Sequence, residues 1–277
     1  MPASSPSPSA APASGSPSCS PAVPDRPLRE DRIGNVRPST ERPPVITHLL
    51  DAGDFARAAS TGEAVVGGEG YRHLFRARRL ATGERLRLVD GRGRARWAEV
   101  KRVGRRDAVL VLGGEAPANE PAYALQLVVA MLRPERAAWL VEKATELGVV
   151  AIRFLRTART PRELSAARLG RLERVARAAL VQCHRARLPE ISGVHPWAEL
   201  ERLVHGQGDR FFLDPEADPA TRLERRGLSG TVLVGPEGGW DATEQKTLAR
   251  HAVPIGLGPR ILRVETAALV AAARLLP

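Results

Sequence analysis

The sequence of 277 residues is poor in cysteine and has no apolar run long enough to span a bilayer. Its two cysteines, Cys19 and Cys183, cannot form a disulfide framework or a cysteine metal cluster, and its six histidines show no metal-ligand spacing. We therefore expect a protein of the reducing cytoplasm, with no metal and no membrane partner.

Lysine is also scarce, because it occurs only at Lys101, Lys143 and Lys246. Almost all of the positive charge is arginine, and the formal net charge is +11. GC-rich codon usage accounts for the choice of arginine, but it does not account for the excess of cations over acids. A net charge this positive favours a polyanionic partner, and nucleic acid is the first candidate.

The chain begins with a segment of biased composition, because Pro, Ala and Ser dominate residues 1–44. Such a segment cannot bury enough apolar surface to offset the entropy of ordering it, so we predict a disordered tail. It has no basic stretch followed by an apolar one, which argues against a secretion signal.

Residues 45–122 predict a small β domain. Alternating strands at 85–88 and 96–100 flank a turn at 90–93, and residues 108–114 add another strand. Between Arg72 and Arg106 there are 13 Arg or Lys residues against three acids. A solvated basic face is the ordinary interpretation, but this density favours a surface that contacts phosphates.

From residue 123 onward, predicted strands and helices alternate. Apolar runs at 125–132 and 150–155 indicate buried strands, and short strands follow within 210–215, 231–235 and 254–258. Helices are predicted over 134–147, between Pro134 and Gly148, and over 166–187 and 264–276. This alternation predicts a mostly parallel sheet with helices on both faces.

The stretch TVLVGPEGGWDATEQ, residues 231–245, predicts a strand, a glycine loop and a helix. Such a loop often holds a phosphate, yet the P-loop and dinucleotide fingerprints are both absent. Asp241 and Glu244 predict a capping box that satisfies the helix N-terminus from within. Because Glu237 would repel a phosphate, we expect a ligand without phosphates that carries positive charge.

A second glycine loop follows in PIGLGPRILRVETAALV, residues 254–270, with Gly256 and Gly258 at the end of a short strand. Either loop alone would be interpreted as an ordinary tight turn. Together, and expected on neighbouring strands, they predict one pocket that is bounded mainly by backbone. Backbone donors and acceptors can recognise an adenine there.

These paired motifs carry a family resemblance. LVGPEGGW followed by LGPRILRVETAA resembles the bacterial small-subunit ribosomal RNA (uracil-N3)-methyltransferases, of the SPOUT or α/β-knot class. Further matches are KATELGV at 143–149, QCHR with LPEI within 182–191, and RHLFRARRLATGE with VDGRGR in the basic region. The resemblance covers residues 65–277.

The resemblance implies a PUA-like β-barrel for RNA at 45–122 and a trefoil-knotted SPOUT domain at 123–277. The implied cofactor is S-adenosyl-L-methionine, the implied substrate is a uridine of small-subunit (16S) ribosomal RNA, and the implied assembly is a homodimer. The positions that match the family's cofactor loops are Leu213, Gly235, Pro236, Glu237, Gly238, Gly239, Leu257, Gly258, Ile261, Leu262 and Thr266. RNA contacts are expected at His73, Arg76, Arg79 and Arg159.

The catalytic candidates stand at the end of the second motif. Arg263 is expected to stabilise the negative charge that develops on the uracil. Glu265 is either a proton acceptor or the carboxylate that orients an arginine.

The chain departs from the family pattern at three places. Ala158 with Arg159 replaces the usual Glu-Arg pair, Val264 replaces a threonine, and VITHLLDAG matches the family's first strand poorly. Three alternatives are therefore kept: the same fold acting on another RNA site, a catalytically silent RNA-binding protein, and a nucleotide-dependent α/β enzyme. The missing phosphate motifs disfavour the last.

Overall fold

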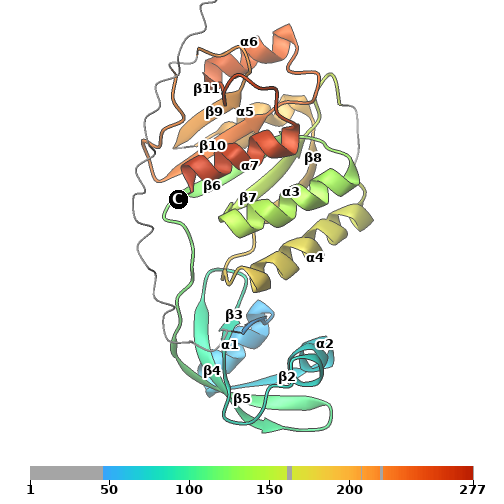
Figure 1. Ribbon diagram of the computed structural model, residues 1–277, viewed down its shortest axis with the longest axis vertical. Helices are drawn as coiled ribbons and strands as arrows, with labels where there is room; N and C mark the ends of the chain where they lie inside the picture. Colours follow the sequence, from blue (N-terminus) through green and yellow to red (C-terminus); the bar gives the residue numbers. More distant parts are fainter. Residues whose placement is uncertain (1–45, 161–163, 207, 219–220, 277) are drawn as a thin grey trace, which may run out of the picture. The chain divides into compact units, whose positions relative to one another are not determined.

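The computed structural model describes residues 46–160, 164–206, 208–218 and 221–276. The tail predicted at residues 1–44 lies outside these ranges. Two sheets, one N-terminal and one C-terminal, organise the described chain (Figure 1). None of the helices in these ranges is both long and apolar enough to cross a membrane.

The predicted PUA-like barrel is a five-stranded sheet in the order β1-β3-β4-β5-β2. Its strands are β1 (Thr47–Leu49), β2 (Glu63–Gly67), β3 (Arg85–Val89), β4 (Ala95–Val103) and β5 (Asp107–Glu115). The predicted strands at 85–88, 96–100 and 108–114 are confirmed within β3, β4 and β5. The poorly matching first motif also forms a strand, because β1 pairs with β3 in parallel while the other pairs are antiparallel.

Three helical segments accompany this sheet: α1 (Ala52–Thr61), α2 (Gly68–Tyr71) and the π-helical turn η1 (Arg72–Ala77). In α1, Phe55 and Ala58 are three residues apart and buried, and Gly62 ends the helix with a φ of 79°. Phe55 packs into a core with inward side chains of the strands, including Leu86, Val100 and Leu110.

The C-terminal sheet is entirely parallel, which confirms the predicted architecture. Its strands are β6 (Ala124–Ala130), β7 (Ala151–Leu155), β8 (Glu190–His195), β9 (Asp209–Leu213), β10 (Ser229–Val234) and β11 (Val253–Ile255). They run in the order β11-β9-β10-β6-β7-β8, so the sheet has β11 and β8 at its two edges. The central strand β6 buries apolar side chains on both faces, as the run at 125–132 predicted.

Helices cover both faces of this sheet, as predicted. One face packs against α3 (Pro134–Leu147), α4 (Ala166–Gln182) and α7 (Val264–Leu275). The other packs against α5 (Leu200–Val204), which follows the short turn η2 (Trp197–Glu199), and against α6 (Ala242–His251). The bounds of α3 follow from Pro134 in its first turn and from Gly148, whose φ of 102° ends it.

The chain returns from the sheet edge to the sheet centre at its C-terminal end. β11 is an edge strand, whereas α7, which follows it, lies against α3, β6 and β10 (Figure 1). The predicted knot, in which this return passes through a loop, stays a prediction.

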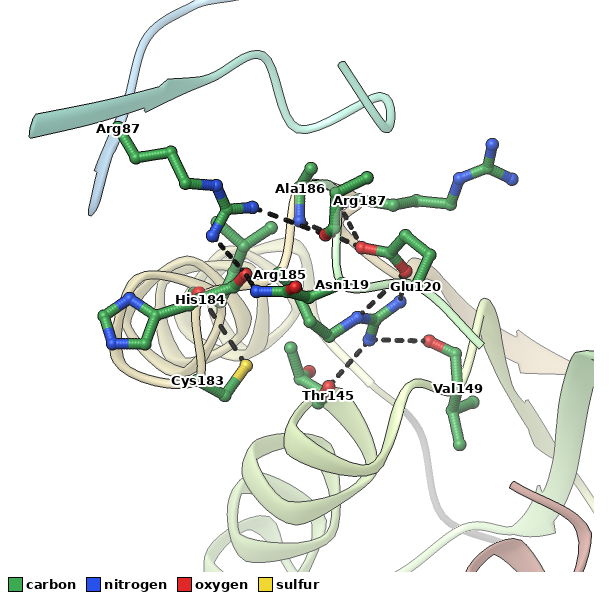
Figure 2. Close-up of polar contacts among 12 residues, drawn as sticks. Arg87, Asn119, Glu120, Thr145, Val149, Cys183, His184, Arg185, Ala186 and Arg187 are labelled. Carbon is green, nitrogen blue, oxygen red and sulfur yellow. Dashed lines mark hydrogen bonds and ion pairs between the residues drawn. The ribbon is translucent and has the colours of Figure 1, made fainter. Parts of the chain in front are cut away.

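The helix predicted over 166–187 ends at Gln182, because Cys183 caps it and His184 turns the backbone left-handed with a φ of 59°. The next residues meet the N-terminal sheet (Figure 2). Arg87 of β3 donates a hydrogen bond of 2.5 Å to the carbonyl of His184, and Val89 packs on Leu180 and Ala186. Arg87 is only 2% exposed, so this member of the basic run is not available to a phosphate.

Candidate active site

The two glycine loops and the end of β9 share the carboxyl edge of the parallel sheet, where such sheets bind ligands. We predicted that the loops follow neighbouring strands, and this prediction is wrong. β9 lies between β10 and β11, because the chain leaves the sheet after β9 and returns on either side of it. Leu213, the last residue of β9, consequently stands between the two loops.

The first loop is built around a buried indole. A Cβ atom added to Gly235 would lie 2.8 Å from Cε2 of Trp240, so the ring occupies the space of any side chain there. Trp240 is 7% exposed, and its Nε1 donates a hydrogen bond of 3.1 Å to the carbonyl of Leu213. Trp240 thus holds the first loop against the end of β9.

The rest of the loop is a tight turn into α6. The N–H of Gly239 donates to the carbonyl of Pro236 at 2.9 Å, and Gly239 has a φ of 71°. The predicted capping box is confirmed: Asp241 accepts from the N–H of Glu244 at 2.7 Å, and Glu244 accepts from the N–H of Asp241 at 2.9 Å. The N-terminus of α6 is therefore satisfied from within.

The second loop presents backbone rather than side chains. Gly258 has a φ of 122°, and an added Cβ would meet no atom within 4 Å. Ile261 is 79% exposed, whereas Leu257 packs on the core of the sheet. Leu262 and Thr266 are half-buried, and Arg263 is exposed as the N-cap of α7.

A cavity of about 430 Å³ opens beside the first loop. It is lined by Ala130, Met131, Leu132, Arg133, Arg136, Arg159, Thr160, Pro236, Glu237, Gly238 and Val264. Of the predicted site residues, the cavity brings together Pro236, Glu237, Gly238 and Arg159. Of the second motif, Val264 at the start of α7 lines the cavity, and residues 256–263 do not.

Arg136, which belongs to none of the sequence motifs, connects both glycine motifs. Its guanidinium forms an ion pair with Glu237 of the first loop, and its Nε lies 3.7 Å from Oε1 of Glu265 in α7. Glu265 is 6% exposed, and its Oε2 has no hydrogen-bond partner among the residues that the structure describes. The place of Arg136 in the sequence could have indicated this role, because Arg133 and Arg136 stand at the start of the helix that follows the central strand β6.

The loop after β7 closes another side of the cavity. Arg159 donates to the carbonyl of Gly238 through Nη1, so it contacts the first glycine loop as well as being a predicted RNA ligand. Ala158 donates its backbone N–H to Oε1 of Glu244 at 2.8 Å. Ala158 departs from the family pattern in its side chain, but it makes this contact through its backbone.

The other predicted RNA contacts lie on the N-terminal sheet. His73 and Arg76 belong to η1, Arg79 follows it with a φ of 57°, and all three are exposed. Arg76 donates to the carbonyl of Arg105 at 3.2 Å and lies over the ring of Tyr71. None of the three lines the cavity.

Comparison with known proteins identifies the two parts of the chain. Residues 119–276 match the model of an RNA methyltransferase domain, and residues 66–113 match an RNA methyltransferase PUA domain. The ribosomal RNA small subunit methyltransferase E of Mycobacterium tuberculosis is 33% identical over 229 residues, which cover 75% of this chain and 84% of the relative. The Bacillus subtilis protein of the same name is 25% identical, covering 74% of this chain and 86% of the relative.

Solved structures show the same fold. A ribosomal RNA small subunit methyltransferase E from Neisseria gonorrhoeae, bound to S-adenosyl methionine, superposes with a TM-score of 0.72 at 23% identity. The match covers 83% of this chain and 96% of that one. A predicted RNA methyltransferase from Thermotoga maritima is 28% identical, with a TM-score of 0.59 and coverage of 83% and 96%. The chain therefore belongs to the RNA methyltransferase family of the ribosomal RNA small subunit methyltransferases E.

Proposed function

We propose that this protein methylates N3 of a uridine in small-subunit ribosomal RNA, with S-adenosylmethionine as the methyl donor. The observation that carries the proposal is the carboxyl edge of the sheet, where two glycine loops flank Leu213 beside an arginine-lined cavity. The domain roles belong to the proposal too: residues 45–122 bind RNA and residues 123–277 carry the chemistry.

The residues present fit this cofactor. Gly258 leaves backbone without a side chain on one side of Leu213, and Gly235 on the other side makes room for the Trp240 ring that holds the first loop in place. Two loops made mainly of backbone suit an adenosine held by main-chain groups. The capped N-terminus of α6 offers nothing to a phosphate, and the cofactor has none. Glu237 and Glu265 are carboxylates, and the methyl donor is a cation. We assign the cofactor to Leu213, residues 235–239, Leu257, Gly258, Ile261, Leu262 and Thr266.

S-adenosylmethionine supplies an electrophilic methyl group when it is bound. The protein must remove the N3 proton of the uracil and stabilise the charge that spreads over O2 and O4. Arginine does not act as a base at neutral pH, so the proton must go elsewhere. Oε2 of Glu265 is buried and without a partner in the described residues, which makes it our proton acceptor.

Arginines orient the carboxylate and stabilise the negative charge on the uracil. Oε1 of Glu265 faces Arg136, so the carboxylate is held by one oxygen while the other stays available. Arg263 is exposed at the start of α7, and we assign to it the stabilisation of the uracil oxygens. Arg133, Arg136 and Arg159 position the uracil, which adds to the rate of methyl transfer.

A cytoplasmic homodimer completes the proposal, on the strength of the family alone. Light scattering of the full-length protein should report twice the chain mass of 29.9 kDa at micromolar concentration, and a monomer would contradict it.

The decisive experiment identifies the product. Unmodified small-subunit ribosomal RNA is incubated with the protein and isotope-labelled S-adenosylmethionine, digested to nucleosides and analysed by mass spectrometry. Labelled 3-methyluridine supports the proposal. Label in another nucleoside would show the same fold acting at a different site, and RNA binding without label would show a silent binding protein.

A further inference from the structure

A second cavity lies on the N-terminal sheet, away from the candidate active site. It has a volume of about 400 Å³ and is lined by Arg85, Trp97, Ala98, Glu99, Lys101, Val111, Leu112 and Gly113, from β3, β4 and β5. We call it the Trp97 groove. None of the individually predicted RNA contacts His73, Arg76, Arg79 and Arg159 lines it, although Arg85 and Lys101 belong to the basic run between Arg72 and Arg106.

An accessible aromatic ring sits in this groove. Trp97 is half-buried in β4, a strand whose pairing with β5 is interrupted between Arg96 and Ala98 and again between Val100 and Arg102. Such irregularities re-aim side chains and are frequent beside functional sites. Gly113, the neighbour on β5, is exposed and puts no side chain beside the ring.

The surroundings of the ring combine apolar surface with positive charge. The guanidinium carbon of Arg85 lies 5.5 Å from the centre of the Trp97 ring, and Val111 is 39% exposed. Lys101 is exposed and pairs with Glu63 at 2.6 Å, so the charge of that carboxylate is balanced. An aromatic face next to an arginine on a sheet is the arrangement by which proteins stack nucleobases while contacting the backbone.

We propose that the Trp97 groove binds one unpaired RNA base, which stacks on the indole while Arg85 contacts the adjoining phosphate. The proposal rests on RNA being the substrate. It adds a contact of a different physical kind from the basic surface, because stacking depends little on salt whereas phosphate contacts release counterions.

Glu99 gives the groove a preference among bases. This exposed carboxylate lies opposite Arg85 in the β3–β4 register. It repels a phosphate, but it accepts a hydrogen bond from an exocyclic amine. Cytosine and adenine carry such an amine and uracil does not, so we expect the groove to prefer cytosine to uracil at equal length.

The test uses the full-length protein with three probes: a small-subunit ribosomal RNA fragment, short oligocytidylate, and oligouridylate of the same length. Trp97→Ala should weaken binding of oligocytidylate by about 5- to 150-fold, the equivalent of ~1–3 kcal/mol for one stacked base. The slope of log affinity against log salt should not change. Trp97→Phe should retain most of the affinity, and Glu99→Gln should reduce the preference for oligocytidylate over oligouridylate.

Matched controls separate this inference from the proposed function. Val65→Ala removes a side chain that is 65% exposed on β2 of the same sheet and should leave RNA binding unchanged. Circular dichroism and urea unfolding of Trp97→Ala report whether the N-terminal sheet of the variant is folded. If the wild-type protein binds RNA and folded Trp97→Ala binds it equally well, the groove is not a base site, while the proposed function stands. If the wild-type protein binds no RNA, both are wrong.

Discussion

The buried Arg185 and the half-buried Glu120 form an ion pair that joins the segment before β6 to the turn after α4 (Figure 2). Nη2 of Arg185 lies 2.7 Å from Oε2 of Glu120, and its Nη1 donates to the carbonyls of Thr145 and Val149 at 2.7 and 3.1 Å. The other oxygen of Glu120 accepts from the N–H groups of Ala186 and Arg187. One carboxylate thus balances a buried cation and orders the turn that contacts the N-terminal sheet.

Glu120→Gln should therefore lower the free energy of unfolding by about 3 kcal/mol, because it leaves the Arg185 charge buried without a counter-ion. Urea unfolding followed by circular dichroism measures the change. Glu63→Gln breaks the exposed pair with Lys101 and should cost about 1 kcal/mol or less. Equal effects of the two substitutions would contradict the structural role of the buried pair.

Gly258→Val should abolish S-adenosylmethionine binding in calorimetry. The position has room for a side chain, but a β-branched residue cannot hold a φ of 122° without strain of about 1–3 kcal/mol, so the loop must move. Gly193→Val is the control, because Gly193 has an ordinary φ and open space around it. If the Gly258→Val protein bound the cofactor as the wild type does, the cofactor site would not include this loop.

The combined change of Arg76 and Arg79 to Ala should weaken RNA binding and flatten its salt dependence by roughly one unit for each lost phosphate contact. Cofactor affinity should not change. Arg171 and Arg174, exposed with the same spacing on α4, provide a control pair of equal charge. An unchanged salt slope in the Arg76 and Arg79 double variant would mean that this basic surface is merely solvated.

Arg263→Ala should slow methyl transfer by about 100-fold or more at saturating RNA and cofactor, as expected when a group that stabilises developing charge is removed. RNA and cofactor affinities should stay close to wild type. Arg260→Ala, an exposed arginine of the same loop, should retain activity. Single-turnover rates compare the two variants, and a loss of RNA affinity in place of rate would move Arg263 from chemistry to recognition.

His48 makes the N-terminal sheet sensitive to acid. Burial, and to a smaller extent the charge of the nearby His73, lowers the pKa of His48 to about 4. Because the unfolded chain takes up a proton near pH 6.5 and the folded one does not, stability is complete above pH 6.5 and falls as the pH drops toward 4.

We expect this histidine to account for a loss of about 2 kcal/mol between pH 7.5 and pH 5, and His48→Gln should remove that loss. Urea unfolding at the two pH values measures it, with exposed His205→Gln as the control. A wild-type protein and a His48→Gln variant with the same pH dependence would show that His48 does not titrate in this way.

Local sequence signals were enough to predict several parts of this fold. Pro134 and Gly148 delimit α3, and Asp241 with Glu244 caps α6, because each of these signals acts within one turn of the residue that carries it. The parallel sheet followed from buried apolar runs that alternate with helices. The two glycine loops at strand ends could also be predicted from the sequence, because each is a local pattern. The absence of phosphate-binding motifs could be seen in the same way.

Tertiary structure alone decided which of these parts meet. No local pattern places β9 between the two glycine loops, because strand order depends on pairing between segments far apart in the chain. Arginine is ordinarily exposed, yet Arg87 and Arg185 are both buried. Their partners are distant in the chain, because Glu120 lies 65 residues before Arg185 and the His184 carbonyl 97 residues after Arg87. Arg136 joins the site for the same physical reason: its partners Glu237 and Glu265 reach it only when β6, β10 and α7 pack together.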